Sequence, residues 1–409
     1  MNKVLVIGGG AAGMMAAVFA ARAGAETVLL EPNERLGKKL NITGKGRCNV
    51  TNDSACDELI AHVPRNGKFL YSTFSRWDGR DTMVFFESLG VPLKVERGKR
   101  VYPSSDRSFD ISAALERELK RLNVRLVRGR AEALIVKDGR VSGAKIGRER
   151  CGADAVVVAT GGVSYPATGS TGDGYRFAKQ AGHTIVEPRA SLVPLESDDP
   201  DCAAMQGLSL RNVTLTVRSQ KNKVVFEELG ELMFTHFGIS GPLVLSASAH
   251  MRDFERDGYR LIIDLKPALE EKKLDERLLR EFAARSNQDF DNVLGALVPR
   301  SMIPVIVRRT GIPAAAKANS ITKEQRRRLL ETLKAFSVSV TGPRGVEEAI
   351  VTSGGVRVGE VDPNTMASKL APGLYFAGEV LDVDAYTGGF NLQIAWATGK
   401  AAGEAAAGL

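Results

Sequence analysis

Residues 4–32 read VLVIGGGAAGMMAAVFAARAGAETVLLEP, and this stretch decides the class of fold. The apolar run Val4–Ile7 predicts a buried strand, and the alanine-rich run Ala11–Ala23 predicts a helix. A second apolar run, Thr27–Leu30, predicts another strand, which Glu31-Pro32 ends. A strand, a helix and a strand in this order form a β-α-β unit. We therefore expect an α/β fold with a parallel sheet whose faces are covered by helices.

Three glycines between the first strand and the helix have the spacing G-x-G-x-x-G. In a Rossmann-like dinucleotide site, Gly8 permits the tight turn, Gly10 lets a pyrophosphate approach the backbone, and Gly13 lets the helix pack on the strand. The helix N-terminus then faces the phosphate charge. Glu31 ends the second strand and is placed to accept hydrogen bonds from an adenosine ribose. Because a carboxylate disfavours a 2′-phosphate, the motif predicts FAD or NAD and not NADP.

A second glycine-rich stretch, YFAGEVLDVDAYTGGFNLQIAWATG, occupies residues 375–399. A predicted strand, Leu374–Ala377, leads to Gly378-Glu379 at the edge of the sheet where open α/β folds bind ligands. Gly388-Gly389 precede a predicted helix, 392–407, whose bare N-terminus favours negative charge such as that of a reduced flavin. The first stretch would hold adenosine and pyrophosphate, and the second the ribityl chain and flavin ring. Since NAD needs no second site of this kind, the two stretches together favour FAD.

Two further segments supply candidate cofactor contacts. The strand and turn ADAVVVATGG, residues 153–162, contribute Thr160 and Gly161, although a strand that ends in glycines is also an ordinary turn. In the loop ITGKGRCNVTN, residues 42–52, Arg47 is a candidate for phosphate or the electron-rich edge of the flavin, and Asn49 for the ring or ribityl chain. Cys48 suggests a redox thiol, but it has no partner in sequence, so an inert packed thiol is the favoured interpretation.

The hydrophobic pattern predicts two domains, one of them discontinuous. Further apolar runs fit the first sheet, and residues 131–146 predict a hairpin that turns at Asp138-Gly139. The pattern changes near Pro194, with strand-like alternation over 191–265 and helical periodicity over 266–336. We therefore expect a Rossmann-like FAD-binding domain, 1–190 and 337–409, interrupted by an inserted domain, 191–336.

One histidine of the predicted insert is a candidate for proton transfer. His236 lies in FTHFGISGP, residues 234–242, where two glycines and a proline predict a tight turn. A substrate that gains or loses a hydride needs a proton donor or acceptor within hydrogen-bond reach. The alternative is a histidine that is bonded to the loop backbone. Asp382, Asp384 and Tyr386 are further candidates for the same cavity.

Composition excludes several classes of protein. The chain has 409 residues, with 56 Lys and Arg against 48 Asp and Glu, a net charge of +8. Because the basic residues are scattered, we expect no nucleic-acid partner, and the run Arg326–Arg328 is interpreted as a solvated helix face. The four cysteines form no C-x-x-C pair and no metal spacing, which favours a reducing cytoplasm. The N-terminus imitates a signal peptide, but its glycines indicate a folded domain, and no membrane span is expected.

The motifs resemble those of known flavoproteins. GGGAAG, ATGG and GLYFAGEVLDVDAYTGGFNLQ are similar to the FAD domain of the fumarate reductase, succinate dehydrogenase and aspartate oxidase superfamily. LNITGKGRCNVTN, FTHFGISGP, TSGGV and TMASK resemble the BaiN-type bacterial flavoproteins over essentially the whole chain. The resemblance implies a discontinuous FAD domain with an inserted β-barrel-like and helical domain. Lys38 and Lys45 depart from the family pattern, which has Arg and Gly there.

The motifs and the resemblance together give a set of expected site residues. His236 is the catalytic candidate, and no metal ligand is expected. The expected cofactor-binding residues are Gly8, Gly10, Ala12, Gly13, Glu31, Lys39, Gly44, Arg47, Cys48, Asn49, Ala133, Thr160, Gly161, Gly378, Glu379, Asp382, Gly388, Gly389, Asn391 and Leu392.

These residues predict a cytoplasmic FAD-dependent oxidoreductase. It would hold FAD without a covalent bond, accept electrons from NAD(P)H as a transient donor and transfer a hydride between flavin and a small organic substrate. The alternatives are an oxygen-using flavin oxidase of the amine-oxidase kind and an FAD-bearing protein of RNA modification or binding. No second G-x-G-x-x-G predicts a separate nicotinamide domain, and the lack of C-x-x-C argues against disulfide reduction.

Overall fold

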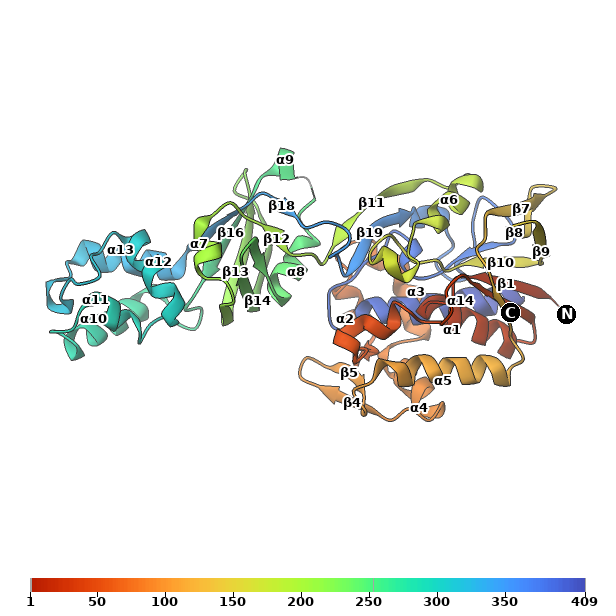
Figure 1. Cartoon of the computed structure of the whole chain (residues 1–409), viewed down its shortest axis with the longest axis horizontal. Helices are drawn as coiled ribbons and strands as arrows, with labels where there is room; N and C mark the ends of the chain where they lie inside the picture. The colour runs from red at the N-terminus through yellow and green to blue at the C-terminus, as the bar shows by residue number, and fades with distance from the viewer. Residues whose placement is uncertain (1, 253, 409) are drawn as a thin grey trace. The chain divides into compact units, whose positions relative to one another are not determined.

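A computed structural model describes residues 2–252 and 254–408. Its central sheet is parallel and has the strand order β20-β10-β1-β2-β6 (Figure 1). Val4–Ile7 and Val28–Leu30 are almost completely buried, as expected for strands covered on both faces. The strands are β1 (Lys3–Ile7), β2 (Glu26–Glu31), β6 (Arg125–Arg128), β10 (Ala155–Val158) and β20 (Leu374–Phe376).

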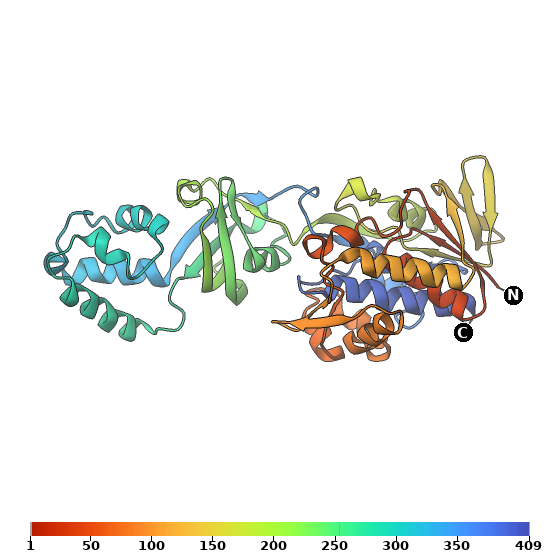
Figure 2. The same cartoon turned by 60° about the horizontal axis from the view of Figure 1, so that its bottom comes forward.

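Helices from the two ends of the chain pack against each other beside this sheet. Figure 2 shows α14 (Phe390–Ala407), which packs against α1 (Ala11–Arg22), and α1 also contacts α5 (Ser108–Arg121). Glycine makes the close approach of α1 and α14 possible. A Cβ at Gly399 would lie 2.5 Å from the Ala12 carbonyl oxygen, and one at Gly403 would lie 2.3 Å from that of Ala16. The two glycine-rich ends of the sequence therefore form one packed layer.

The carboxyl ends of the parallel strands bring separate loops to one edge of the sheet. β1 leads to Gly8, β2 ends at Glu31, β10 leads to Thr160, and β20 leads to Gly378. Ligands of open α/β sheets bind outside this edge. The predicted α/β fold is confirmed.

Smaller elements surround the sheet. The predicted hairpin at Asp138-Gly139 is confirmed, because Lys137 pairs with Arg140 across its turn. The remaining elements of this part of the chain are η1 (Leu40–Gly46), β3 (Thr51–Asn52), α2 (Cys56–Ala61), η2 (Gly67–Leu70), α3 (Tyr71–Arg76), α4 (Gly79–Ser88), β4 (Leu93–Glu96), β5 (Arg100–Pro103), β7 (Ala133–Lys137), β8 (Arg140–Ile146), β9 (Glu149–Gly152), η3 (Pro166–Thr168), α6 (Asp173–Gln180), β11 (Ile185–Ser191), β19 (Val351–Val356), η6 (Val358–Glu360) and η7 (Gly378–Val380).

The chain divides into two compact units. Unit 1 consists of Met1–Ser191 and Gly345–Leu409, and unit 2 is Leu192–Arg344. Each unit has its own cluster of buried apolar side chains.

Unit 2 contains an antiparallel sheet and a group of helices. The sheet order is β17-β16-β13-β14-β15-β12-β18, and Thr341 separates the two edge strands β17 and β18. The sheet therefore returns on itself, in agreement with the expected barrel-like insert. Its strands are β12 (Leu195–Glu196), β13 (Ser209–Ser219), β14 (Val224–Thr235), β15 (Gly238–Ser240), β16 (Tyr259–Asp264), β17 (Phe336–Val340) and β18 (Gly342–Pro343).

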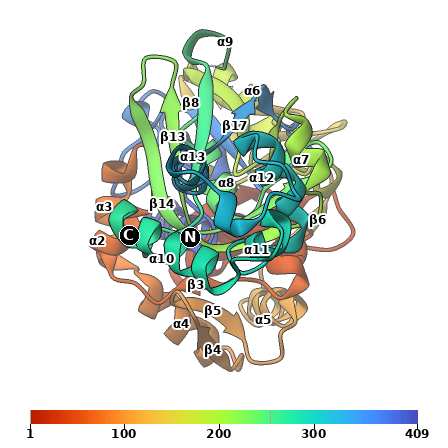
Figure 3. The same cartoon turned by 90° about the vertical axis from the view of Figure 1, so that its left-hand side faces the viewer.

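Most helices of unit 2 follow its long strands in the sequence. α10 and α12 each contact α13, as Figure 3 illustrates. Leu274, Leu278 and Leu329 are completely buried in this helical part. The helices are α7 (Pro200–Ala204), α8 (Pro242–Ser248), α9 (Phe254–Asp257), α10 (Glu271–Ala284), α11 (Phe290–Leu294), η4 (Arg300–Met302), α12 (Ile303–Thr310), η5 (Ala318–Ser320) and α13 (Lys323–Lys334).

The predicted return to the first domain at residue 337 is wrong. β17, Phe336–Val340, pairs with β16, so this strand completes the sheet of unit 2. The return follows Arg344, and β19 then pairs with β11 in unit 1. Alternation in a sequence indicates a strand but does not identify the sheet that the strand joins, because pairing depends on partners far away in the chain. Within residues 2–252 and 254–408, no helix has the length and apolarity to cross a membrane.

Candidate functional site

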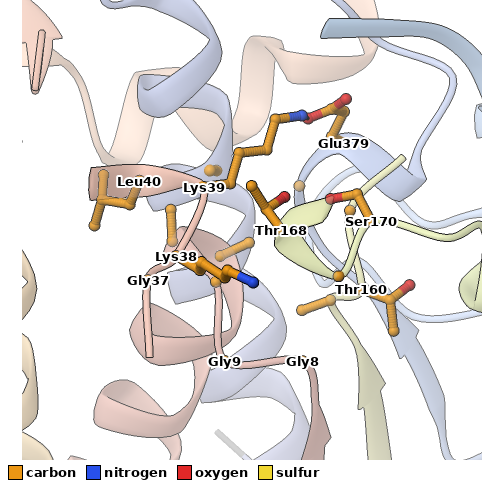
Figure 4. Close-up of a pocket in the computed structure, with 18 of the residues that line it drawn as sticks. Gly8, Gly9, Gly37, Lys38, Lys39, Leu40, Thr160, Thr168, Ser170 and Glu379 are labelled. Carbon is orange, nitrogen blue, oxygen red and sulfur yellow. The ribbon is translucent and has the colours of Figure 1, made fainter. Parts of the chain in front are cut away.

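A pocket in unit 1 lies where the strand-end loops meet, as Figure 4 shows. It is lined by residues that follow the carboxyl ends of β1, β2, β6, β10 and β20 and by residues at the N-terminus of α14. The lining includes Ile7–Ala12, Leu30–Asn33, Gly37–Leu40, Gly129–Ala131, Ala159–Gly161, Thr168–Ser170, Ala377–Glu379, Asn391 and Leu392.

The three glycines of the first turn have different structural roles. Gly8 has a φ of +107°, and a Cβ there would lie 2.5 Å from the Ala159 carbonyl oxygen. A Cβ at Gly13 would lie 1.8 Å from the Gly8 carbonyl oxygen, so only glycine lets α1 begin this close to β1. At Gly10, a Cβ would meet no described atom within 4 Å. Gly10 therefore borders open space at the N-terminus of α1, the arrangement that a diphosphate requires.

The carboxylate of Glu31 is fixed beside this turn. Its Oε2 accepts a hydrogen bond from the Gly9 N–H at 2.6 Å. Its Oε1 accepts from the Asn33 backbone N–H at 2.9 Å and from Asn33 Nδ2 at 2.7 Å. Oε1 therefore already accepts two hydrogen bonds, whereas Oε2 accepts one and keeps a lone pair that can accept a hydrogen bond from a ribose hydroxyl.

A second carboxylate, Glu379, forms an ion pair in the pocket wall. Lys39 Nζ lies 2.7 Å from Glu379 Oε2 and 2.7 Å from Ser164 Oγ. Ser164 Oγ and the Thr352 N–H donate to Glu379 Oε1 at 2.8 and 2.9 Å. Burial acts to raise the pKa of Glu379, but Lys39 and these hydrogen bonds together hold it below the ordinary value. Glu379 is therefore a fixed anion at neutral pH, and Figure 4 shows it facing Lys39.

The N-terminus of α14 closes another side of the pocket. Gly389 begins this helix with a φ of +99°, and no described side chain caps it. A Cβ at Gly389 would lie 2.3 Å from the Thr51 carbonyl carbon and oxygen. Asn391 accepts from the Ala385 N–H at 2.9 Å and donates to the Ala385 carbonyl at 2.6 Å, which holds the preceding loop in place.

These residues fit a bound FAD. The helices α1 and α14 both present N-termini at the pocket without a side-chain cap from the part of the chain described. Thr160 Oγ1 is buried at the pocket and has no hydrogen-bond partner among residues 2–252 and 254–408. Uncapped helix N-termini and an unsatisfied buried hydroxyl are the groups that an anionic, polar ligand satisfies.

The structure brings many of the predicted cofactor residues together in the pocket lining. Gly13 lies behind the lining and packs α1 on β1. The predicted residues in the lining are Gly8, Gly10, Ala12, Glu31, Lys39, Thr160, Gly161, Gly378, Glu379, Asn391 and Leu392.

Other predicted residues lie outside the lining and have partners of their own. Arg47 is paired with Glu96 and with Asp106, at 2.8 Å from its Nε, and its guanidinium stacks over the Tyr102 ring at 4.1 Å. The charge of Arg47 is therefore paired with these carboxylates, and Arg47 does not make the expected cofactor contact. Cys48 is completely buried, and burial raises the pKa of its thiol to about 12. Cys48 is therefore a packed thiol, in agreement with the favoured interpretation.

The loop residues near α14 support the pocket from behind. With its amide oriented to satisfy both neighbours, Asn49 accepts from the Gly389 N–H at 3.0 Å and donates to the Thr51 carbonyl at 3.1 Å. Gly388 accepts a hydrogen bond from Asn52 at 3.0 Å. Gly44 has a φ of +57° and packs near Asn49. These residues shape the loop that faces α14.

Three more predictions have separate outcomes. Ala133 begins β7 and pairs with Lys145, whereas Ala131, two residues earlier, lines the pocket. Asp382 is buried and contacts Arg65 instead of the pocket. His236 is exposed in the turn between β14 and β15 of unit 2, with its ring 5.1 Å from that of Phe237.

Sequence reasoning missed several lining residues. Gly129, Arg130 and Ala131 follow β6. Their position after the carboxyl end of a predicted parallel strand was the feature of the sequence that could have identified them. Gly9 also lines the pocket, but the G-x-G-x-x-G spacing does not single it out. Lys38 also lines the pocket and donates to the Ala167 carbonyl at 2.7 Å. Within the described part of the chain, no three His, Cys, Asp or Glu side chains are grouped to hold a metal ion.

The whole chain matches a known family. The family model described as "HI0933-like protein Rossmann domain" matches residues 2–405. The chain belongs to this family. It is 35% identical over 413 residues to the 3-dehydro-bile acid delta(4,6)-reductase of Clostridium scindens, covering 100% of this chain and 99% of that protein. It is 31% identical over 397 residues to the ribosomal RNA dihydrouridine synthase of Escherichia coli, covering 96% and 95%.

Solved structures confirm the fold. The 3-ketosteroid delta1-dehydrogenase of Sterolibacterium denitrificans aligns with a TM-score of 0.53 and 14% identity, over 100% of both chains. The 3-ketosteroid-delta4-(5alpha)-dehydrogenase of Rhodococcus jostii RHA1 aligns with a TM-score of 0.51 and 16% identity, over 100% of this chain and 97% of that one. With the family match, the reductase relative and the fitted pocket, the chain is an FAD-dependent oxidoreductase, and its resemblance to BaiN-type flavoproteins is confirmed.

Proposed function

We propose that this enzyme reduces a carbon–carbon double bond conjugated with a carbonyl group, with NAD(P)H as the source of electrons. One observation carries the proposal. The relatives at 35% and 31% identity, which match nearly the whole chain, are named for reactions of this kind, on a 3-dehydro-bile acid and on a uracil ring. In each, the reduced double bond is conjugated with a carbonyl, which withdraws electrons and makes the bond accept hydride.

The residues of the pocket would hold FAD in an extended arrangement. Glu31 would bind the adenosine ribose, the N-terminus of α1 the pyrophosphate, and the Lys39–Glu379 pair the ribityl chain. When bound, the flavin supplies hydride transfer. The N-terminus of α14 would stabilise negative charge on the ring. Among the described residues in the pocket lining there is no cysteine, histidine or tyrosine, which supports non-covalent binding.

The first candidate substrate is a small conjugated enone. The relative with 35% identity acts on a bile acid by its name, and a substrate of this kind needs an apolar enclosure. We propose His236, on an exposed turn of unit 2, as a candidate proton donor to this substrate.

Anaerobic spectroscopy tests this proposal. The holoenzyme is first bleached with NADH or NADPH, and the reoxidants are then added one at a time: cyclohexenone, a 3-oxo-4-ene steroid, its saturated analogue, and uridine. We expect the flavin colour to return with a conjugated enone and not with the saturated analogue. Rapid reoxidation by oxygen together with none by any enone would favour the oxidase alternative.

The second candidate substrate is uridine within RNA. A specific observation favours it besides the relative at 31% identity. Residues 117–150 carry eleven basic against four acidic side chains, so the basic residues are less evenly scattered than the composition of the whole chain suggests. These basic side chains are all exposed, as binding to phosphates requires: Arg117, Lys120, Arg121, Arg125, Arg128, Arg130, Lys137, Arg140, Lys145, Arg148 and Arg150.

RNA binding and RNA product separate the two candidates. Ribosomal RNA that lacks dihydrouridine is incubated with the enzyme and NADPH, digested to nucleosides and examined by mass spectrometry. A gain of two mass units on uridine supports the second candidate. The logarithm of RNA affinity should also fall linearly with the logarithm of salt concentration. Salt-independent, weak retention on heparin together with unmodified uridine would exclude it.

A further inference from the structure

Two buried carboxyl groups stand directly behind the wall of the FAD pocket. Asp382 and Asp384 flank Val383, which lines the pocket. The two side chains are 4% and 2% exposed. Carboxylates are rarely buried this deeply unless they are paired, because desolvation of a charge is costly. The positions of these two residues therefore call for a functional explanation.

The hydrogen bonds of the pair leave one oxygen of each carboxyl unsatisfied. Asp382 Oδ2 lies 3.2 Å from Arg65 Nη2 and accepts from Asn66 Nδ2 at 3.0 Å. Asp384 Oδ2 accepts from Ser191 Oγ at 2.7 Å. Oδ1 of Asp382 and Oδ1 of Asp384 are buried without a hydrogen-bond partner in the described part of the chain.

The charges around the pair do not balance if both groups are ionised. The guanidinium of Arg65 is the cation that acts on both carboxyls. The neighbouring Tyr175 hydroxyl is neutral, since burial raises its pKa, and Glu379 is already paired with Lys39. Two carboxylates and one guanidinium would leave a net negative charge in a buried site. Burial raises the pKa of both aspartates, and the charge of Asp382 raises that of Asp384 further.

We propose that Asp382 and Asp384 together hold one proton at neutral pH, and that this pair is the proton store for substrate reduction. The first part of the proposal is supported by the burial of both aspartates and by the single guanidinium available to balance two carboxylates. The second part rests on the proposed function, because reduction of a conjugated double bond requires a proton as well as a hydride.

Atoms and electrons balance in the reduction step. When bound, reduced flavin would supply the hydride that forms a C–H bond at the β-carbon, while the π electrons of the double bond move toward the α-carbon and carbonyl. The α-carbon then gains a proton, for which an O–H bond of the carboxyl pair breaks and leaves its electrons on oxygen. The resulting carboxylate faces Arg65, and water restores the proton. Val383 lies between the pair and the pocket. The pair would therefore supply its proton to the substrate indirectly, and neither aspartate is a catalytic residue in contact with substrate.

Infrared difference spectroscopy of the holoenzyme tests the shared proton. A neutral carboxyl has a carbonyl band that is separate from the carboxylate bands and shifts on labelling with ¹³C-aspartate. We expect this band in the wild-type protein and in Asp138→Asn, whose aspartate is exposed in a hairpin turn. It should vanish in Asp384→Asn, and also in Asp382→Asn, because the one remaining aspartate then ionises opposite Arg65. A wild-type protein without the band, or a band that persists in Asp384→Asn, would overturn the proposal.

Folding of the variants is checked by FAD content and circular dichroism. If Asp382→Asn fails to fold because Arg65 loses its carboxylate partner, Asp384→Asn decides, since its amide oxygen can still accept from Ser191.

Rapid mixing tests the second part of the proposal. In Asp384→Asn, bleaching by NAD(P)H should keep its rate, and reoxidation by the enone should slow by about 10²-fold, at the lower end of the range for positioned proton donors. The wild-type rate should fall as pH rises and the pair loses its proton, and the variant should lack this fall. A wild-type reoxidation rate in the variant would overturn the role as a store. If no enone reoxidises even the wild type, the proposed function fails, and the infrared band then decides the shared proton on its own.

Discussion

At the scale of single residues, carboxyl groups in similar strand-end loops have different surroundings and therefore different charge states. Glu379 is held as an anion by Lys39 and by hydrogen bonds from Ser164 and Thr352. Asp384, five positions later, is almost completely buried, and the nearby guanidinium of Arg65 is in contact with Asp382. Burial and the number of nearby cations therefore decide which carboxyl is ionised.

The first prediction concerns Glu31. Glu31→Ala should weaken FAD binding by about 1.5–3 kcal/mol, the range for hydrogen bonds to a charged group, or about 10- to 150-fold in Kd. Calorimetric titration of the apoprotein with FAD measures this. Because Glu31 also holds the Gly9 N–H, Glu31→Gln separates loss of ribose contacts from loosening of the turn. The exposed Glu34→Ala is the control, and unchanged affinity in Glu31→Ala would show that Glu31 does not contact the ribose.

The second prediction concerns pH and the aspartate pair. The native state keeps a proton that the unfolded state releases above a pKa of about 3.9, because burial raises the folded-state pKa of Asp384. Stability should therefore fall as pH rises from about 4 until the folded pKa is passed. Asp384→Asn removes this titration, so its unfolding free energy relative to wild type should increase with pH. Urea denaturation at a series of pH values measures it, and parallel curves for the two proteins would contradict it.

At the scale of elements, backbone contact between α1, β1 and α14 depends on glycine. Gly13 lets α1 meet β1, and Gly399 and Gly403 let α14 meet α1. These contacts bring the helix N-termini to the same pocket. The cofactor site is thus a consequence of how closely the helices pack, as well as of the loops between them.

The third prediction compares two glycines of one motif. Gly13→Ala should cost about 3 kcal/mol or more in unfolding free energy, at the high end for overpacking, because its Cβ would lie 1.8 Å from a backbone oxygen. Gly10→Ala should keep the stability within about 0.5 kcal/mol, since Gly10 has a φ of −79° and open space beside it. It should instead weaken FAD binding by filling part of the pocket. Urea midpoints of the apoproteins and FAD titrations test both, and equal stabilities of the two variants would refute the comparison.

At the scale of the whole molecule, the chain leaves one folding unit and returns to it. The boundaries are Ser191–Leu192 and Arg344–Gly345, and the buried apolar clusters of the two units share no residue. The pocket is lined by residues of unit 1. The pocket that fits FAD therefore belongs to a unit with its own buried core.

The fourth prediction follows from the separate cores. A protein in which a short Gly-Ser linker replaces Leu192–Arg344 should fold and bind FAD. If the insert acts as the cap that its place in the sequence predicts, the reduced flavin of this protein should react with oxygen faster than that of the full chain, because a cap excludes water and oxygen from the ring. Flavin content and stopped-flow reoxidation measure these properties. An insoluble product, or one without flavin after reconstitution, would show that unit 1 needs the insert.

The fifth prediction tests the proposed role of His236. If its exposed turn contacts the substrate, His236→Ala should keep FAD and fold but slow reoxidation by substrate about 10²–10⁴-fold. Lys221→Ala, in the turn at the other end of β14, is the matched control. Rapid-mixing rates equal to those of the control would leave His236 as an ordinary surface residue.

The sequence alone determined the β-α-β unit, the parallel sheet, the glycine turns and the choice of FAD, because these depend on local periodicity and on spacing within a few residues. Only the tertiary structure decided the partners of Arg47, the assignment of Phe336–Val340 to the second sheet, and the burial of Asp382 and Asp384. Strand pairing, ion pairing and burial depend on contacts between residues far apart in the chain. A local sequence pattern does not show which distant segment packs beside it.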